Sequence, residues 1–261
     1  MTLLGILFIL LTVLESAARS VLGLFAIAPD TGFYTGMGGL VLAHNLLYLV
    51  GAAVLALLIL LPREEPSLPE YPGRTLPMLL AATGLVLCVG SFVSFFGDLY
   101  DFTAGGDTHF GRVVAGPFAI IAAVAMFYLG LRALHGEYRM NIWGASMPAL
   151  WMAVQAVGRF MEYKTIASIS DQTLEVVTLC VGALFWLAHA RVVSPQGGLP
   201  ARKAKFWALL FSLFSVSLCV GQAVATLSGR QISVQMPLIS IAGFLLMGVY
   251  AALFAGELKK E

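Results

Sequence analysis

Long apolar runs are the feature of this sequence that most limits what it can fold into. Eight such runs, each of about 20 residues, fill most of the 261-residue chain. A helix of that length matches the hydrocarbon thickness of a bilayer, and it satisfies its own backbone hydrogen bonds. The sequence therefore predicts an all-α integral membrane protein, built as a bundle of eight transmembrane helices.

The composition agrees with this class and leaves little chain for anything else. Hydrophobic residues make up 59% of the sequence and charged residues 11%, which is too little polar surface to cover a soluble globule. We expect one polytopic membrane domain over residues 1–261 and no soluble domain. The predicted spans lie near Leu3–Ile27, Gly38–Leu61, Leu76–Phe96, Val113–Leu134, Ile142–Met161, Leu174–Ala190, Phe206–Leu227 and Met236–Leu253.

Basic residues in the connections predict the orientation. With eight spans, ten Lys and Arg residues fall on the side that carries both termini and three fall on the other. Because basic loops stay in the cytoplasm, we expect both termini there, in a cell membrane of the bacterial inner-membrane type. The ten are Arg63, Arg74, Arg132, Arg139, Arg191, Arg202, Lys203, Lys205, Lys259 and Lys260, and the three are Arg112, Lys164 and Arg230.

Two spans have a competing interpretation. Leu3–Leu14 followed by Ser16 is similar to a cleavable signal peptide, but no basic residue precedes it and the apolar run resumes, which favours a retained helix. The fifth span is the weakest, because Gln155, Arg159 and Glu162 interrupt it. Removing it would spread the basic residues over both sides, so eight spans are favoured over seven.

Polar side chains recur at helical spacing within several spans, mostly in the half predicted to face outward. Charged groups in hydrocarbon are costly, so these side chains are expected to face one another or water. The pattern predicts a polar cavity that opens outward and binds a small ligand. The candidate residues are Glu15, Arg19, His44, Asn45, Tyr48, Asp98, Gln155, Arg159, Glu162, Glu175 and Gln222.

A purely structural interpretation of the same charges stays open. Glu15 and Arg19 have the spacing of an intrahelical ion pair, and Arg159 is placed to reach Glu162 or Glu175. Such pairs sometimes serve only to fix how helices pack. The charge balance argues against this structural interpretation. The candidate set holds two arginines and four acidic residues, so some of the acids need a proton, water or a cationic group.

The histidines and cysteines suggest no metal site or cofactor. His44 is suited to a proton-coupled step or to a hydrogen bond between helices, and His189, beside Arg191, is expected at the interface. The cysteines have no metal-binding spacing. The segment from Asp98 to His109 gathers oxygen ligands, but its Gly and Asp content favours a solvated loop.

The sequence favours a transporter-like or sensor-like protein with an outward-facing binding cavity. A non-catalytic membrane partner or regulatory subunit of a larger complex is the main alternative, and an intramembrane enzyme is the third. No HExxH, GxSxG or Walker motif is present, and no catalytic residues are assigned. The expected partners are the lipid bilayer, a small polar or charged ligand, and a membrane or cytoplasmic protein, with no nucleic acid.

Overall fold

The structure is a computed structural model in which every regular element among the described residues is a helix. It describes residues 3–28, 34–61, 66, 73–106, 108, 110–162, 170–195, 201–229 and 237–258, without the side chains of 162 and 170–172. An isolated β-bridge joins Ile27 to Tyr34. The helices are α1 (Leu3–Phe25), α2 (Gly38–Leu60), α3 (Thr75–Thr103), α4 (Phe110–Leu134), α5 (Ile142–Ala145), α6 (Met147–Glu162), α7 (Ser170–Val193), α8 (Ala201–Leu227) and α9 (Leu238–Glu257).

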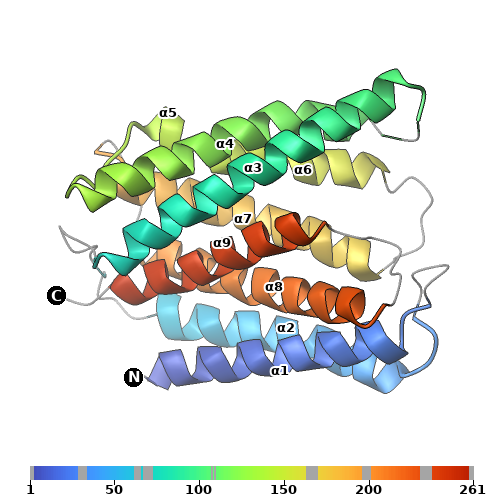
Figure 1. Ribbon diagram of the computed structural model, residues 1–261. Helices are drawn as coiled ribbons and strands as arrows, with labels where there is room; N and C mark the ends of the chain where they lie inside the picture. Colours follow the sequence, from blue (N-terminus) through green and yellow to red (C-terminus); the bar gives the residue numbers. More distant parts are fainter. Residues whose placement is uncertain are drawn as a thin grey trace.

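The long helices run up and down along one common direction (Figure 1). The pair α1 and α2 lies on one side of the bundle, α3 to α6 lie on the other, and α7, α8 and α9 lie between them. The helix α1 begins and α9 ends at the same end of the bundle, called here the terminal end. The opposite end, where α3 and α6 end and α7 and α9 begin, is called the distal end.

Seven of the described helices are long and apolar enough to cross a membrane: α1, α2, α3, α4, α7, α8 and α9. The prediction of an all-helical chain whose helices are long and apolar enough to span a membrane is therefore confirmed. The predicted number of eight is not exact, because the segment 142–162 is not one long helix.

The predicted fifth span is broken into α5 and α6 at Ser146. Pro148 has no backbone N–H to donate to the carbonyl of residue 144, so it is tolerated in the first turn of α6 but interrupts a continuous helix. With 16 residues, α6 extends only about 24 Å. Together, α5 and α6 still run from the terminal end to the distal end beside α4.

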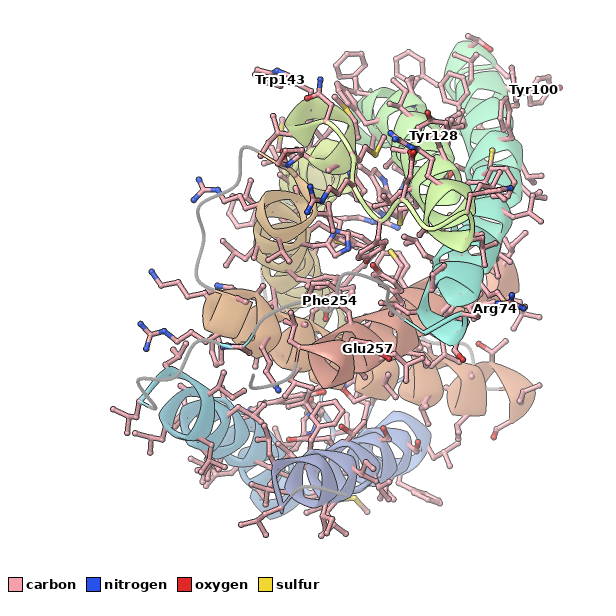
Figure 2. All side chains as sticks on the ribbon, turned by 90° about the vertical axis from the view of Figure 1, so that its left-hand side faces the viewer. Arg74, Tyr100, Tyr128, Trp143, Phe254 and Glu257 are labelled. Carbon is pink, nitrogen blue, oxygen red and sulfur yellow. The ribbon has the colours of Figure 1, made fainter. Side chains whose placement is uncertain are left out.

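The buried centre of the molecule is formed by α7, α8 and α9. Phe185 and Trp186 of α7, Phe211 of α8, and Tyr250 and Phe254 of α9 are the largest fully buried side chains. Figure 2, which views the terminal end, shows Phe254 near the middle of the bundle and Trp143 and Tyr100 at its periphery. Large apolar side chains cover the outside, as expected where a helix faces lipid rather than water.

Helices α3 and α4 pack with their backbones in close contact, and glycines make this possible. A Cβ atom at Gly84 of α3 would lie 2.8 Å from the carbonyl oxygen of Ala123 in α4. A Cβ atom at Gly130 of α4 would lie 2.8 Å from the Cα of Ala81 in α3. Small residues at such crossings let membrane helices gain dispersion contacts, and this pair forms one wall of the cavity described below.

Replacing these glycines is expected to separate the two helices. Gly84→Ala and Gly130→Ala should each lower the free energy of unfolding by about 1 to 3 kcal/mol, because the added methyl group meets backbone atoms that cannot move aside locally. Thermal unfolding of the purified protein in detergent measures the effect. The matched control is Gly256→Ala in α9, where nothing lies within 4 Å of the added Cβ; equal loss in all three variants would contradict the packing argument.

Candidate functional site

The structure divides the predicted site residues between two regions of the bundle. Glu15, Arg19, His44 and Tyr48 lie between α1 and α2, which pack on each other and on α8. Asp98, Gln155 and Arg159 lie among α3, α4, α6 and α9, and Glu175 of α7 contacts Arg159. The sequence pattern placed all of these residues at one cavity. In the structure, α1 and α2 contact only each other and α8 among the described helices, whereas the cavity is lined by α3, α4, α6 and α9.

Three predicted site residues fall outside both groups or outside the description. Gln222 is buried on α8, the helix on which both α1 and α2 pack. Asn45 is exposed on α2, on a different face from His44 and Tyr48. The side chain of Glu162 lies outside the described residues.

The first group is centred on Glu15 and His44. The Nδ1 atom of His44 lies 2.8 Å from Oε2 of Glu15, and the two side chains are 2% and 0% exposed. Tyr48, one turn along α2, packs edge-on against the His44 ring with centroids 4.9 Å apart. Its hydroxyl group is hydrogen-bonded to Ser217 of α8.

Arg19 extends this group by one turn of α1. Its side chain is buried, hydrogen-bonded to Tyr34 and packed over Gly221 of α8. A Cβ atom at position 221 would lie 2.5 Å from Cγ of Arg19, so the glycine provides the space for the arginine stem. The group therefore connects α1, α2 and α8 through charged and hydroxyl side chains instead of apolar contacts alone. We call Glu15, Arg19, His44 and Tyr48 the α1–α2 cluster.

The second region contains a cavity of about 430 Å³ between α3, α4, α6 and α9. Its charged and amide lining groups are Asp98, Asp101, Arg112, Gln155 and Arg159, and its large and small apolar lining groups include Leu87, Ala115, Ala119, Trp151 and Phe244. The directions of the helices place the charged and amide groups toward the distal end, where Pro237 and Ile239 also line the cavity, and Leu87, Trp151 and Phe244 nearer the middle of the bundle. The cavity thus has a polar part toward the distal end, called here its mouth, and an apolar inner wall.

Arg159 is held at the cavity by α7 and by the close approach of α4 to α6. Its Nε atom lies 3.1 Å from Oε1 of Glu175, which is almost fully buried. Next to it, Gly158 faces Gly111, whose Cβ would lie 2.9 Å from the Cα of Gly158. This contact without side chains brings the end of α6 against α4 and places the guanidinium group at the cavity wall.

The segment that begins at Asp98 differs from its predicted loop structure. Helix α3 continues to Thr103, seven residues beyond the predicted end of the span at Phe96, so Asp98 and Asp101 lie on its last turns. Asp107 and His109 lie outside the described residues. Within the described part of the chain, no three His, Cys, Asp or Glu side chains are placed to hold a metal ion together.

A third polar cluster, near the terminal end, was not predicted from the sequence. His189, expected at the interface, is buried, and its Nε2 atom lies 2.6 Å from the hydroxyl of Tyr250 and 3.0 Å from that of Tyr138. The two tyrosine hydroxyls are also hydrogen-bonded to each other. Tyr138 belongs to the connection after α4, which folds back so that the N–H of Met140 donates to the carbonyl of Val193.

This tyrosine–histidine cluster fastens the connection between α4 and α5 onto α7 and α9. Burial raises the pKa of Tyr138, so the phenol keeps its proton and remains a hydrogen-bond donor. Phe185 and Phe254 pack against the His189 ring. The spacing of Phe185 with His189 and of Tyr250 with Phe254 was visible in the sequence, but it did not show that Tyr138 would complete the cluster.

Comparisons of the chain with models of protein families, with curated proteins and with solved structures gave no match. The function is therefore inferred from the geometry of these sites.

Loss of the carboxylate charge beside Arg159 is expected to destabilise the protein. Glu175→Gln should lower the free energy of unfolding by about 1 to 3 kcal/mol, because the largely buried guanidinium group loses its charged partner. Thermal unfolding measures this loss. Glu137→Gln is the matched control, since Glu137 forms a solvent-exposed pair with Arg132 that water screens. A loss in Glu175→Gln no larger than the loss in this control would contradict the expected contribution of the Arg159 contact to stability.

Removal of one phenol from the tyrosine–histidine cluster is expected to have a smaller cost. Tyr138→Phe should lower the free energy of unfolding by about 1 kcal/mol, because the His189 and Tyr250 groups lose a hydrogen-bond partner while the ring packing is kept. Tyr100→Phe, at an exposed position that Figure 2 shows at the periphery, should leave thermal unfolding unchanged. Indistinguishable unfolding curves for the two variants would mean that the cluster contributes nothing to stability.

Proposed function

We propose that this chain is a multi-pass membrane protein that binds a small amphipathic ligand in the cavity between α3, α4, α6 and α9, as a transporter or a sensor. The observation that carries this proposal is the division of the cavity into a charged mouth and an apolar inner wall. A volume of about 430 Å³ falls in the range of small-molecule sites. Such sites combine an apolar lining with a few placed polar groups, as this cavity does.

The charges at the mouth define the polar part of the ligand. Arg159 supplies a planar set of donors that suits a carboxylate or phosphate group. Asp98 and Asp101 of α3 supply acceptors for an ammonium or hydroxyl group. The buried amide oxygen of Gln155 has no hydrogen-bond partner among the described residues, and it is a further acceptor for a ligand donor.

The inner wall defines the apolar part of the ligand. Trp151 of α6 and Phe244 of α9 lie with their ring centroids 6.0 Å apart at a tilted angle. Both rings line the cavity, together with the small side chains of Ala115 and Ala119. An aliphatic or aromatic group of a few carbon atoms would remove its own surface and that of these rings from water.

Ligand binding is better supported than nucleophilic catalysis by a serine at this cavity. Nucleophilic catalysis by a serine needs an adjacent base that accepts its proton. Ser91, Ser94 and Ser240 line the cavity, but none of the described histidines does. His44 faces Glu15 and His189 faces two tyrosines, so both imidazoles belong to other clusters.

The proposed orientation places the cavity mouth on the extracytoplasmic side. Arg74, Arg132, Arg139, Arg191 and Arg202 belong to the terminal end, at the starts and ends of helices that alternate in direction. Basic residues concentrate on the cytoplasmic side of membrane proteins. The distal end, with the mouth of the cavity, would then face outward.

Ligand-dependent thermal stabilisation tests the proposal. The purified wild-type protein is heated with a panel of small amphipathic anions, cations and zwitterions, and at a ligand concentration of about 100 times Kd the binding contributes about 2.7 kcal/mol to stability. Arg159→Gln should abolish or strongly reduce the shift of any anionic or zwitterionic ligand that raises Tm. Arg139→Gln, an exposed position at the terminal end, serves as the matched control and should retain the full shift.

A second variant tests the cavity without changing charge. Ala119→Leu fills part of the inner wall and should reduce the same shift by excluding the apolar part of the ligand. The Tm of each variant without ligand shows whether it is folded. No stabilisation of the wild-type protein across the panel, or a shift that survives both substitutions, would overturn the proposed binding site.

A further inference from the structure

The α1–α2 cluster contains a titratable pair that the proposed ligand cavity does not use. Glu15 lies midway along α1 and His44 in the second turn of α2, and neither residue lines the cavity. Both oxygens of Glu15 and the Nδ1 atom of His44 are buried, and no hydrogen-bond partner of regular geometry is present for them among the described residues. The close approach of His44 to Glu15 at 2.8 Å is therefore the dominant interaction of both groups.

We propose that Glu15 and His44 form a proton-binding site within the membrane-embedded part of the protein. A carboxylate buried without a partner costs several kcal/mol, and an imidazolium ion 2.8 Å away compensates that cost by direct attraction. A proton bound to His44 therefore stabilises the contact between α1 and α2. Release of the proton leaves a carboxylate beside a neutral ring and weakens the same contact.

The groups around the pair determine how strongly it holds the proton. Arg19, one turn from Glu15 on α1, carries a permanent positive charge that opposes an added proton. Tyr48 of α2 and Tyr34 before α2 add phenol groups. Helix α8 adds the thiol of Cys219 but has no charged residue between 206 and 227, so Glu15 is the acidic group from the packed helices that faces His44.

The position of the site connects its proton to helix packing. Tyr48 packs edge-on against His44, stacks on Phe214 with centroids 4.4 Å apart and is hydrogen-bonded to Ser217. Phe214 and Ser217 belong to α8, the most buried of the seven apolar helices. His44 therefore lies next to the contact that attaches the α1–α2 pair to the rest of the bundle. A change in its charge acts directly beside that contact.

The test is a pH titration of the histidine side chains by ¹⁵N NMR in the full-length protein reconstituted in lipid nanodiscs. The chain has four histidines, and the signal that disappears in His44→Gln identifies His44. In the wild-type protein this signal should pass from the neutral to the protonated form as the pH is lowered. Glu15→Gln should move the midpoint to lower pH, because the attractive charge is removed.

Arg19→Gln tests the same electrostatics with the opposite sign. Loss of the positive charge should move the His44 midpoint to higher pH, and this variant keeps the experiment decisive if Glu15→Gln does not fold. Glu257→Gln and Arg191→Gln, both toward the terminal end, are the matched controls for loss of an acid and of a base and should leave the midpoint in place. A His44 signal that stays neutral at every pH, or midpoints that do not move in either cluster variant, would overturn the proposal.

A second readout separates a proton site from a merely structural contact. Protonation of His44 should protect the backbone amides of α1 and α2 from hydrogen exchange, because it strengthens the contact between the helices. In the wild-type protein, protection of α1 and α2 should therefore change through the same pH range as the His44 signal, after correction for intrinsic exchange. His44→Gln should remove this pH dependence, and persistence of the dependence in that variant would contradict the inference.

Discussion

The cost of placing charge in hydrocarbon determines how the helices of this protein are turned. Glu15, Arg19 and Glu175 occur within long apolar helices, and each is almost fully buried. Each of the two carboxylates has a basic side chain as its partner, because Glu15 faces His44 and Glu175 faces Arg159. Rotating α1 or α7 by half a turn about its own axis would expose a charged side chain to lipid. On insertion scales this exposure costs about 2.5 to 3.5 kcal/mol. The apolar outer surface and the polar contacts between helices are thus two results of one constraint.

The central layer of the bundle separates two kinds of polar contact. On one side, α1 and α2 pack against α8 through side chains that fill the space between them, including Arg19 over Gly221. On the other side, α3, α4 and α6 leave a cavity against α9 of the central layer, although α3 and α4 are in close contact at Gly84 and Gly130. The second arrangement suits the binding of a molecule. The first suits the binding of a proton, which needs no cavity.

Much of the fold was predictable because it depends on local sequence properties. An apolar run of sufficient length forms a helix wherever the backbone has no other way to satisfy its hydrogen bonds, and the predicted boundaries at Leu3, Gly38 and Leu227 agree with the structure. Pro148 indicates the break before α6, but the prediction of one continuous span over Ile142–Met161 followed the apolar residues on both sides of this proline. The continuation of α3 to Thr103 was not predictable from hydropathy, since Asp98 and Asp101 reduce the apolar character of a segment that is still helical.

The sequence by itself determined that this chain forms long apolar helices, and that a few ionisable side chains within them must be buried against something. Both follow from free energies of transfer, which depend on the residue and its immediate neighbours. The tertiary structure alone decided which helices meet, and so paired His44 with Glu15, kept both apart from Arg159, and brought Tyr138 to His189. Those contacts join residues far apart in the chain, and they depend on the shape of each helix surface at small residues such as Gly111 and Gly158, which helical spacing does not record.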